Sequence, residues 1–97
     1  MRLRFSPRAT RDLASIGDYL SERNPAAARR VRASIVGTLQ ILTQFPEAGR
    51  QQKVEGVRKI VVRPYPYVIY YSVSGSSGEI YIIAIQHAAQ ERDYEDR

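Results

Sequence analysis

Residues 58–75, RKIVVRPYPYVIYYSVSG, decide the fold of this 97-residue chain. Valine, isoleucine and tyrosine dominate the stretch, and these residue types favour strands. The turn residues PYP at 64–66 divide it in two, and SGSSG at 74–78 separates it from a third apolar run, EIYIIAIQH at 79–87. Three strands joined by short links predict an antiparallel meander over about residues 56–87.

The sequence before this stretch has the spacing of helices. Ser6–Pro7 and Asn24–Pro25 each place a capping side chain before a proline at the first helical position. Apolar residues follow each pair at intervals of three and four, the spacing that places them on one helical face. In the first segment they are Ala9, Leu13, Ile16 and Leu20, and in the second Ala28, Val31, Ile35, Leu39 and Leu42. The short connection predicts an antiparallel helical hairpin over about residues 7–43.

Together these segments predict one small α+β domain over residues 1–97. RLRF at 2–5 alternates as an edge strand does, TQFPEAGRQQ at 43–52 reads as a polar loop, and 88–97 reads as a polar tail. The order is therefore an N-terminal edge strand, the helical hairpin, and the three-stranded meander that completes one sheet.

The middle strand of the meander is apolar on both faces. Tyr67, Ile69, Tyr71 and Val73 share one face, and Val68 and Tyr70 share the other. A sheet with one face in water alternates more cleanly between apolar and polar residues. The hairpin can cover only one face, so the other must meet water, a partner chain, or a curled edge of the same sheet.

The charge of the chain predicts an anionic partner. Its 15 Lys and Arg residues, 13 of them Arg, exceed its ten Asp and Glu residues and give a net charge of +5. Residues 1–90 alone hold 13 cations and six acids, a net charge of +7. Such a body attracts phosphate groups or an acidic protein. The chain has neither a signal-peptide pattern nor an apolar run long enough for a bilayer, so we expect a cytoplasmic protein without membrane contact.

The residue types exclude most catalytic chemistries. With one histidine and no cysteine, a zinc site is implausible, and glycine-rich phosphate loops are absent; we expect no metal and no cofactor. Metal-free RNA cleavage remains open, because it needs a base, an acid and cations around the phosphate. His87, Arg58, Lys59 and Arg63 could supply these. His87 could equally be a hydrogen-bonded histidine at a strand end.

Three motifs, in order, resemble the RelE/ParE superfamily of bacterial type II toxins over nearly the whole chain. They are F-P-x-x-G-R at 45–50, Arg-x-x-Pro-Tyr followed by apolar residues and tyrosine from Arg63, and a last strand that ends in His87 before an Arg-containing tail. The resemblance implies a toxin held inactive by an acidic antitoxin, of ribbon-helix-helix DNA-binding type, whose flexible segment folds over it. We expect that segment to contact the apolar residues Leu13, Ile16, Leu20, Tyr67, Ile69 and Tyr71.

The superfamily has two activities, and the sequence favours one. RelE-like members cut messenger RNA in the ribosome, and they usually carry an arginine at the position of Val68. ParE-like members inhibit DNA gyrase and are not known as enzymes. The valine therefore predicts a ParE-like toxin without catalytic residues, which contacts gyrase through Arg58, Arg63, His87, Arg92 and Tyr94. The alternative is a ribosome-dependent endoribonuclease using His87, Arg63, Arg58 and Lys59, and an inactive or different binding role is also open.

Overall fold

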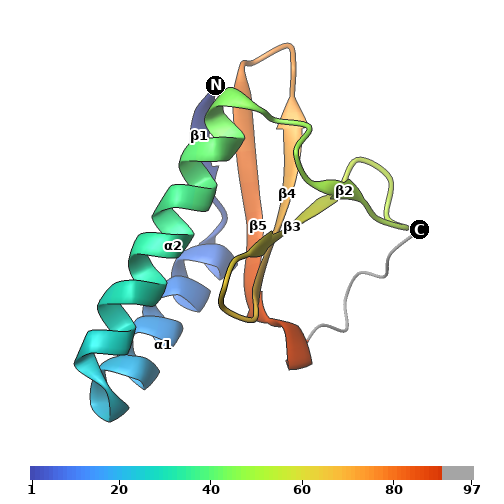
Figure 1. The fold of residues 1–97 in the computed structure, drawn as a ribbon. Coiled ribbons are helices and arrows are strands. Elements are labelled where there is room, and N and C mark those ends of the chain that lie inside the picture. Colours follow the sequence, from blue (N-terminus) through green and yellow to red (C-terminus); the bar gives the residue numbers. More distant parts are fainter. Residues whose placement is uncertain (91–97) are drawn as a thin grey trace.

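The computed structural model describes residues 1–90, which form two helices packed on one side of a five-stranded sheet (Figure 1). In chain order the elements are β1 (Arg2–Phe5), α1 (Pro7–Arg23), α2 (Pro25–Gln44), β2 (Arg50–Gln51), β3 (Arg58–Val62), β4 (Tyr67–Ser74), β5 (Glu79–His87) and a 3₁₀ turn, η1 (Ala88–Gln90). The sheet order is β1-β5-β4-β3-β2. The predicted α+β class and element order are confirmed.

Both helices begin at the predicted caps. The Ser6 hydroxyl accepts a hydrogen bond from the Ala9 amide at 2.9 Å, and the Asn24 side chain accepts one from Ala27 at 3.1 Å. Asn24 also ends α1, because its own amide donates to the Leu20 carbonyl at 2.7 Å. One residue therefore closes one helix and opens the next, which folds α2 back along α1 as the predicted hairpin.

The sheet contains the predicted meander and one strand that was not predicted. β3, β4 and β5 pair antiparallel in sequence order, and β1 pairs parallel with β5 at one edge. At the other edge β2 pairs Arg50 with Lys59 and Gln51 with Arg58. Part of the predicted polar loop therefore pairs with β3 as a strand. Two residues are too few to show the alternation by which a strand is recognised in a sequence.

The main core lies between the helices and one sheet face. Buried isoleucine, valine and tyrosine side chains from β3, β4 and β5 pack there against the buried face of α2. A smaller cluster of Val57, Val68, Tyr70 and Ala84 lies on the opposite face, each 8% exposed or less. Val57 precedes β3, so the chain's own loop packs against the face that the helices leave uncovered.

A β-bulge interrupts β5. Tyr70 lies opposite Ala84, and Tyr71 lies opposite Ile82, which leaves Ile83 without an opposite residue. Ile82 packs in the main core, while Ile83 packs with Ala84 on the other face. A bulge bends its strand and changes the direction of the backbone groups at the strand's edge, here at the end of β5 beside α1.

No helix within residues 1–90 combines the length and apolar character needed to cross a lipid bilayer.

Candidate functional site

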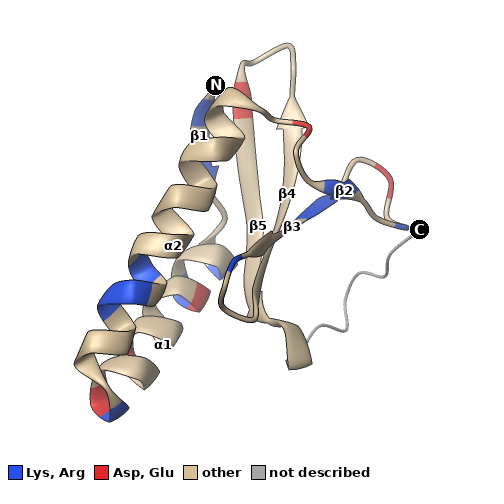
Figure 2. Ribbon diagram, in the orientation of Figure 1, with Lys and Arg blue, Asp and Glu red and all other residues tan. Residues whose placement is uncertain are grey.

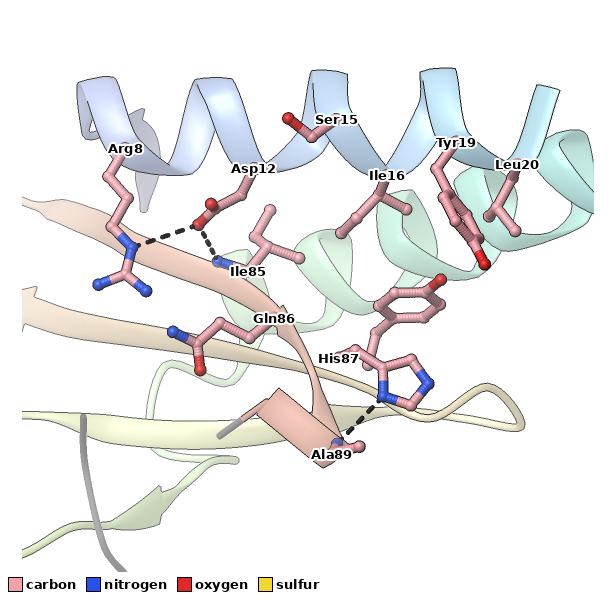
Figure 3. Close-up of a pocket in the computed structure, with 11 residues that line it drawn as sticks. Arg8, Asp12, Ser15, Ile16, Tyr19, Leu20, Ile85, Gln86, His87 and Ala89 are labelled. Carbon is pink, nitrogen blue, oxygen red and sulfur yellow. Dashed lines mark hydrogen bonds and ion pairs between the residues drawn. The ribbon is translucent and has the colours of Figure 1, made fainter. Parts of the chain in front are cut away.

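A groove of about 780 Å³ lies between α1 and the end of β5 (Figure 3). The helix and the strand lie close together near Asp12 and diverge toward Tyr19, so the groove widens along α1 (Figures 1 and 3). Side chains of α1 form one wall, and residues of β4, β5 and η1 form the other. The lining residues are Arg8, Asp12, Ser15, Ile16, Tyr19, Leu20, Tyr67, Ile85, Gln86, His87 and Ala89.

Polar side chains fix α1 to β5 at the narrow end of this groove. β1 ends at Phe5, opposite Ile82, so the edge of β5 continues past its partner strand. The buried Ser6 hydroxyl donates to the Ile83 carbonyl at 2.7 Å. The Asp12 carboxylate accepts from the Ile85 amide at 3.0 Å and lies 3.7 Å from the Arg8 guanidinium. These contacts provide hydrogen-bond partners for the Ile83 carbonyl and the Ile85 amide, backbone groups at the edge of β5 that β1 does not reach.

Aromatic side chains form the wide end. The rings of Tyr67 and His87 meet edge to face, with centroids 5.4 Å apart and planes at 80°. His87 Nδ1 accepts a hydrogen bond from the Ala89 amide at 3.0 Å, which leaves Nε2 as the nitrogen available to a ligand. Burial, and secondarily Tyr19, raises the pKa of Tyr67. Tyr19 is 55% exposed, and the Arg23 guanidinium stacks 3.8 Å from its ring centroid.

The four residues of the nuclease alternative do not come together. Lys59 and Arg58 are adjacent in β3 and therefore face opposite sides of the sheet. Arg58 is four residues from Val62, about 13 Å at the rise of a strand, and Val62 lies in the row of Tyr67 and His87. Only the exposed Arg63, in the turn after β3, lies at the same end of the sheet as His87.

Arg58 holds a loop instead of facing a target. Its guanidinium donates to the Gly49 carbonyl at 2.8 Å and to the Glu47 carbonyl at 3.4 Å, and its side chain is 21% exposed. Arg58 is thus poorly suited to the target contact expected of it.

Tyr71 explains much of the F-P-x-x-G-R motif. Its hydroxyl donates to the Pro46 carbonyl at 2.8 Å and accepts from the Gly49 amide at 2.7 Å. A Cβ at position 49 would lie 2.5 Å from that hydroxyl oxygen, so only glycine fits. Burial is the main cause that raises the pKa of Tyr71. The motif therefore has a structural role: it fastens the loop before β2 to β4.

Two of the six expected antitoxin-contact residues are fully buried, and a third is nearly so. Ile69 and Tyr71 have no exposed area and Tyr67 is 8% exposed, because the face they share is the one that the hairpin covers. For Ile69 and Tyr71 the expectation was wrong.

The expected contact residues of α1 are accessible. Leu13, Ile16 and Leu20 are half-buried and line a second groove of about 380 Å³ between α1 and α2, with Arg29 and Arg32 at its rim.

Several residues of the first groove were missed by the sequence reasoning. Asp12 carried a signal: it lies three residues after Ala9 and four before Ile16, so an acidic residue occupies the apolar face of α1. No pattern in the sequence indicated that Arg8 and Tyr19 line this groove. The expected target contacts Arg92 and Tyr94 lie outside the described residues, and within those residues no three metal-ligating side chains cluster.

Comparisons with known proteins find type II toxins with both ParE and RelE names. Residues 3–92 match the family described as the ParE toxin of type II toxin-antitoxin system, parDE. Toxin RelE2 of Caulobacter vibrioides is 39% identical over 83 residues, which cover 86% of this chain and 90% of that protein.

Solved structures share the fold. One from the chromosomal ParDE TA system from P. aeruginosa superposes with a TM-score of 0.76 at 29% identity, covering 90% of this chain and 95% of that one. The isolated E. coli RelE toxin gives 0.65 at 21% identity, covering 95% and 86%, which shows the fold alone. The chain belongs to the ParE toxin family of type II toxin–antitoxin systems.

Proposed function

We propose that this toxin inhibits DNA gyrase by binding it, without catalysing a reaction, and that its cognate antitoxin prevents this in the cytoplasm. One observation carries the proposal: within residues 1–90, the groups that metal-free RNA cleavage needs are dispersed. Arg58 is held by loop carbonyls, and Lys59 lies on the opposite sheet face. Catalysis by a general acid and base requires both groups within hydrogen-bond reach of one substrate.

Val68 supports the same conclusion. It is 2% exposed and packs with Val57, Tyr70 and Ala84 on the face away from the helices. An arginine there would need room and a partner for its charge, because a buried unpaired charge is strongly destabilising. The packing around Val68 suits an apolar residue, and this position supplies no cation to stabilise a phosphorane.

A RelE-like endoribonuclease is the second candidate function. His87 keeps Nε2 available, and the exposed Arg63 lies at the same end of the sheet. Relatives of this chain also carry RelE names.

Induction of the protein alone, followed by timed measurement of DNA supercoiling and protein synthesis, separates the two functions. We expect supercoiling to fail first, no messenger RNA fragments, and inhibition or trapped DNA cleavage when purified protein meets gyrase and plasmid. Site-specific RNA cleavage that falls by roughly 10²- to 10⁴-fold in His87→Ala would establish the nuclease instead.

Contact residues are tested in the same assay. We expect Arg63→Ala, Arg92→Ala, Tyr94→Ala, or truncation before Glu91 to reduce gyrase inhibition while the antitoxin still binds. Arg11→Ala, an exposed cation on α1, is the matched control. Full inhibition by all four variants would contradict this choice of surface.

A further inference from the structure

The helix α2 carries a cluster of arginines and no acidic residue. Its sequence, Pro25–Gln44, includes Arg29, Arg30 and Arg32 and neither Asp nor Glu. Figure 2 shows these cations in the half of α2 that is nearer to the connection with α1. All three residues are exposed, and within residues 1–90 their side chains have no ion-pair or hydrogen-bond partner. Five other arginines lie 3.3–3.9 Å from a carboxylate: Arg2, Arg4, Arg8, Arg23 and Arg58.

The three arginines surround the solvent side of α2. Successive residues of a helix are about 100° apart, so Arg30 and Arg32 lie on opposite sides of the buried Val31. Arg29 is a neighbour of Arg32 on the helix surface, and these two line the groove between α1 and α2, whereas Arg30 does not. A segment bound in that groove would leave Arg30 unused. A ligand that contacts all three arginines must therefore cover the outward face of the helix.

A glycine on the same face indicates close contact with a ligand. Gly37 lies in the interior of α2, and a Cβ there would meet no atom within 4 Å. Glycine is unfavourable inside a helix because it loses more conformational freedom on folding than alanine does, and the packing around Gly37 does not require it. Ala33, one turn before Gly37, is a neighbour of both Arg29 and Arg30. Small side chains between the arginines allow a bulky ligand to approach the helix backbone.

We propose that this arginine face of α2, formed by Arg29, Arg30, Arg32, Ala33 and Gly37, binds the sugar-phosphate backbone of duplex DNA. A guanidinium group can bind phosphate oxygens through two parallel hydrogen bonds, and all three cations are arginine. The helix has no carboxylate that would repel a polyanion. The inference rests on the proposed function, because gyrase acts on duplex DNA and a toxin bound to gyrase lies near that duplex.

Two variants of equal net charge test the arginine face. The first combines Arg29→Gln, Arg30→Gln and Arg32→Gln, and glutamine retains a good helix propensity. The control combines Arg2→Gln, Arg4→Gln and Arg11→Gln, which are exposed arginines of β1 and α1. Both variants lose three positive charges, so a difference between them reports where the charges lie.

Binding to a short labelled DNA duplex is measured without gyrase, as fluorescence anisotropy across a range of salt concentrations. Each phosphate contact contributes about 0.9 to the slope of log affinity against log salt. We therefore expect the slope of the α2 variant to be shallower by about 2–3, and that of the control to change by less than about 1. No binding by the unmodified protein, or the same change of slope in both variants, would overturn the proposal.

Gly37→Gln separates binding from folding. The site has room for a side chain and glutamine favours a helix, so we expect this variant to be at least as stable as the unmodified protein in urea. It should nevertheless bind the duplex roughly three- to tenfold more weakly, because the longer side chain keeps the DNA backbone away from the helix. Unchanged DNA binding would overturn the placement of the duplex on this face.

Assays with gyrase and with the antitoxin distinguish this inference from the proposed function. We expect the α2 variant to inhibit gyrase less than the control variant does. Weaker binding to the duplex together with full inhibition of gyrase would overturn contact with gyrase-bound DNA. A loss of affinity for the antitoxin alone would also overturn the proposal and assign the arginines to the protein partner. If the unmodified protein does not inhibit gyrase, the proposed function is wrong, whereas the measurement on free duplex still tests binding by α2.

Discussion

Tyr71 shows how one hydroxyl group can organise distant parts of the chain. Its oxygen bonds the carbonyl of Pro46 and the amide of Gly49, which are 25 and 22 positions away. Strand periodicity correctly placed Tyr71 on one face with Ile69, but it could not show that the hairpin covers that face. The same limit made both residues look available to an antitoxin.

The first prediction concerns the stability that this hydroxyl provides. Tyr71→Phe leaves a buried amide and a carbonyl without partners, so we expect a loss of about 2–4 kcal/mol in the free energy of unfolding. Tyr81→Phe is the matched control, since Tyr81 is 41% exposed, and its effect should stay within about 0.5 kcal/mol. Urea unfolding measures both, and equal effects would show that the Tyr71 hydroxyl has no special role.

The second prediction concerns alkaline pH. Burial raises the pKa of folded Tyr71 above its ordinary value, so the folded state holds this proton more tightly than the unfolded state does. The resulting stability is fully present below the unfolded pKa of about 10, and it is lost as pH rises through the folded pKa. We therefore expect the stability of Tyr71→Phe to decline less steeply than that of the unmodified protein above pH about 10. The decline that remains in this variant is due partly to Tyr67, whose pKa is also raised. Parallel curves for the two proteins would refute this cause.

At the scale of elements, local signals were predictable and pairing was not. Both helix starts could be predicted because a capping side chain and a proline act within one turn. β2 could not, because its two residues form a strand only through pairing with β3. The bulge at Ile83 could not be predicted either. EIYIIAIQH has apolar residues at both odd and even positions, so the sequence does not show where the alternation between faces changes.

The third prediction compares the two helix caps. Asn24 is exposed and its side chain bonds only the start of α2, whereas buried Ser6 also bonds the Ile83 carbonyl. We expect Asn24→Ala to cost about 1 kcal/mol and Ser6→Ala about 2–3 kcal/mol of unfolding free energy. Thermal and urea unfolding measure the difference. Equal costs would mean that the contact with β5 adds nothing to the cap.

At the scale of the whole molecule, net charge predicts an anionic partner, but it could not show where the cations lie relative to one another. The nuclease alternative combined Arg58, Lys59, Arg63 and His87. Arg58 and Lys59 are neighbours in the sequence, yet side chains alternate along β3 and place these two on opposite faces of the sheet. Position along the strand separates them from His87. Of these residues, the structure places Arg63 and His87 at the same end of the sheet.

The fourth prediction concerns the antitoxin complex as a whole. The +7 body attracts an acidic partner through charges that salt screens, while the apolar linings of the two grooves are not screened. We expect affinity to fall by about one to two orders of magnitude between ~0.1 and ~1 M salt and then to level off. Calorimetry across this range measures it. Complete dissociation at high salt would show that charge alone holds the complex.

The bulge in β5 has a consequence for how sequences of this family can vary in length. Ile83 and Ala84 lie on the same face, so removal of Ile83 would restore regular alternation without turning any later side chain to the wrong side. An added residue elsewhere in β5 would instead exchange the faces of every residue after it. One-residue gaps in alignments of relatives should therefore concentrate at this position.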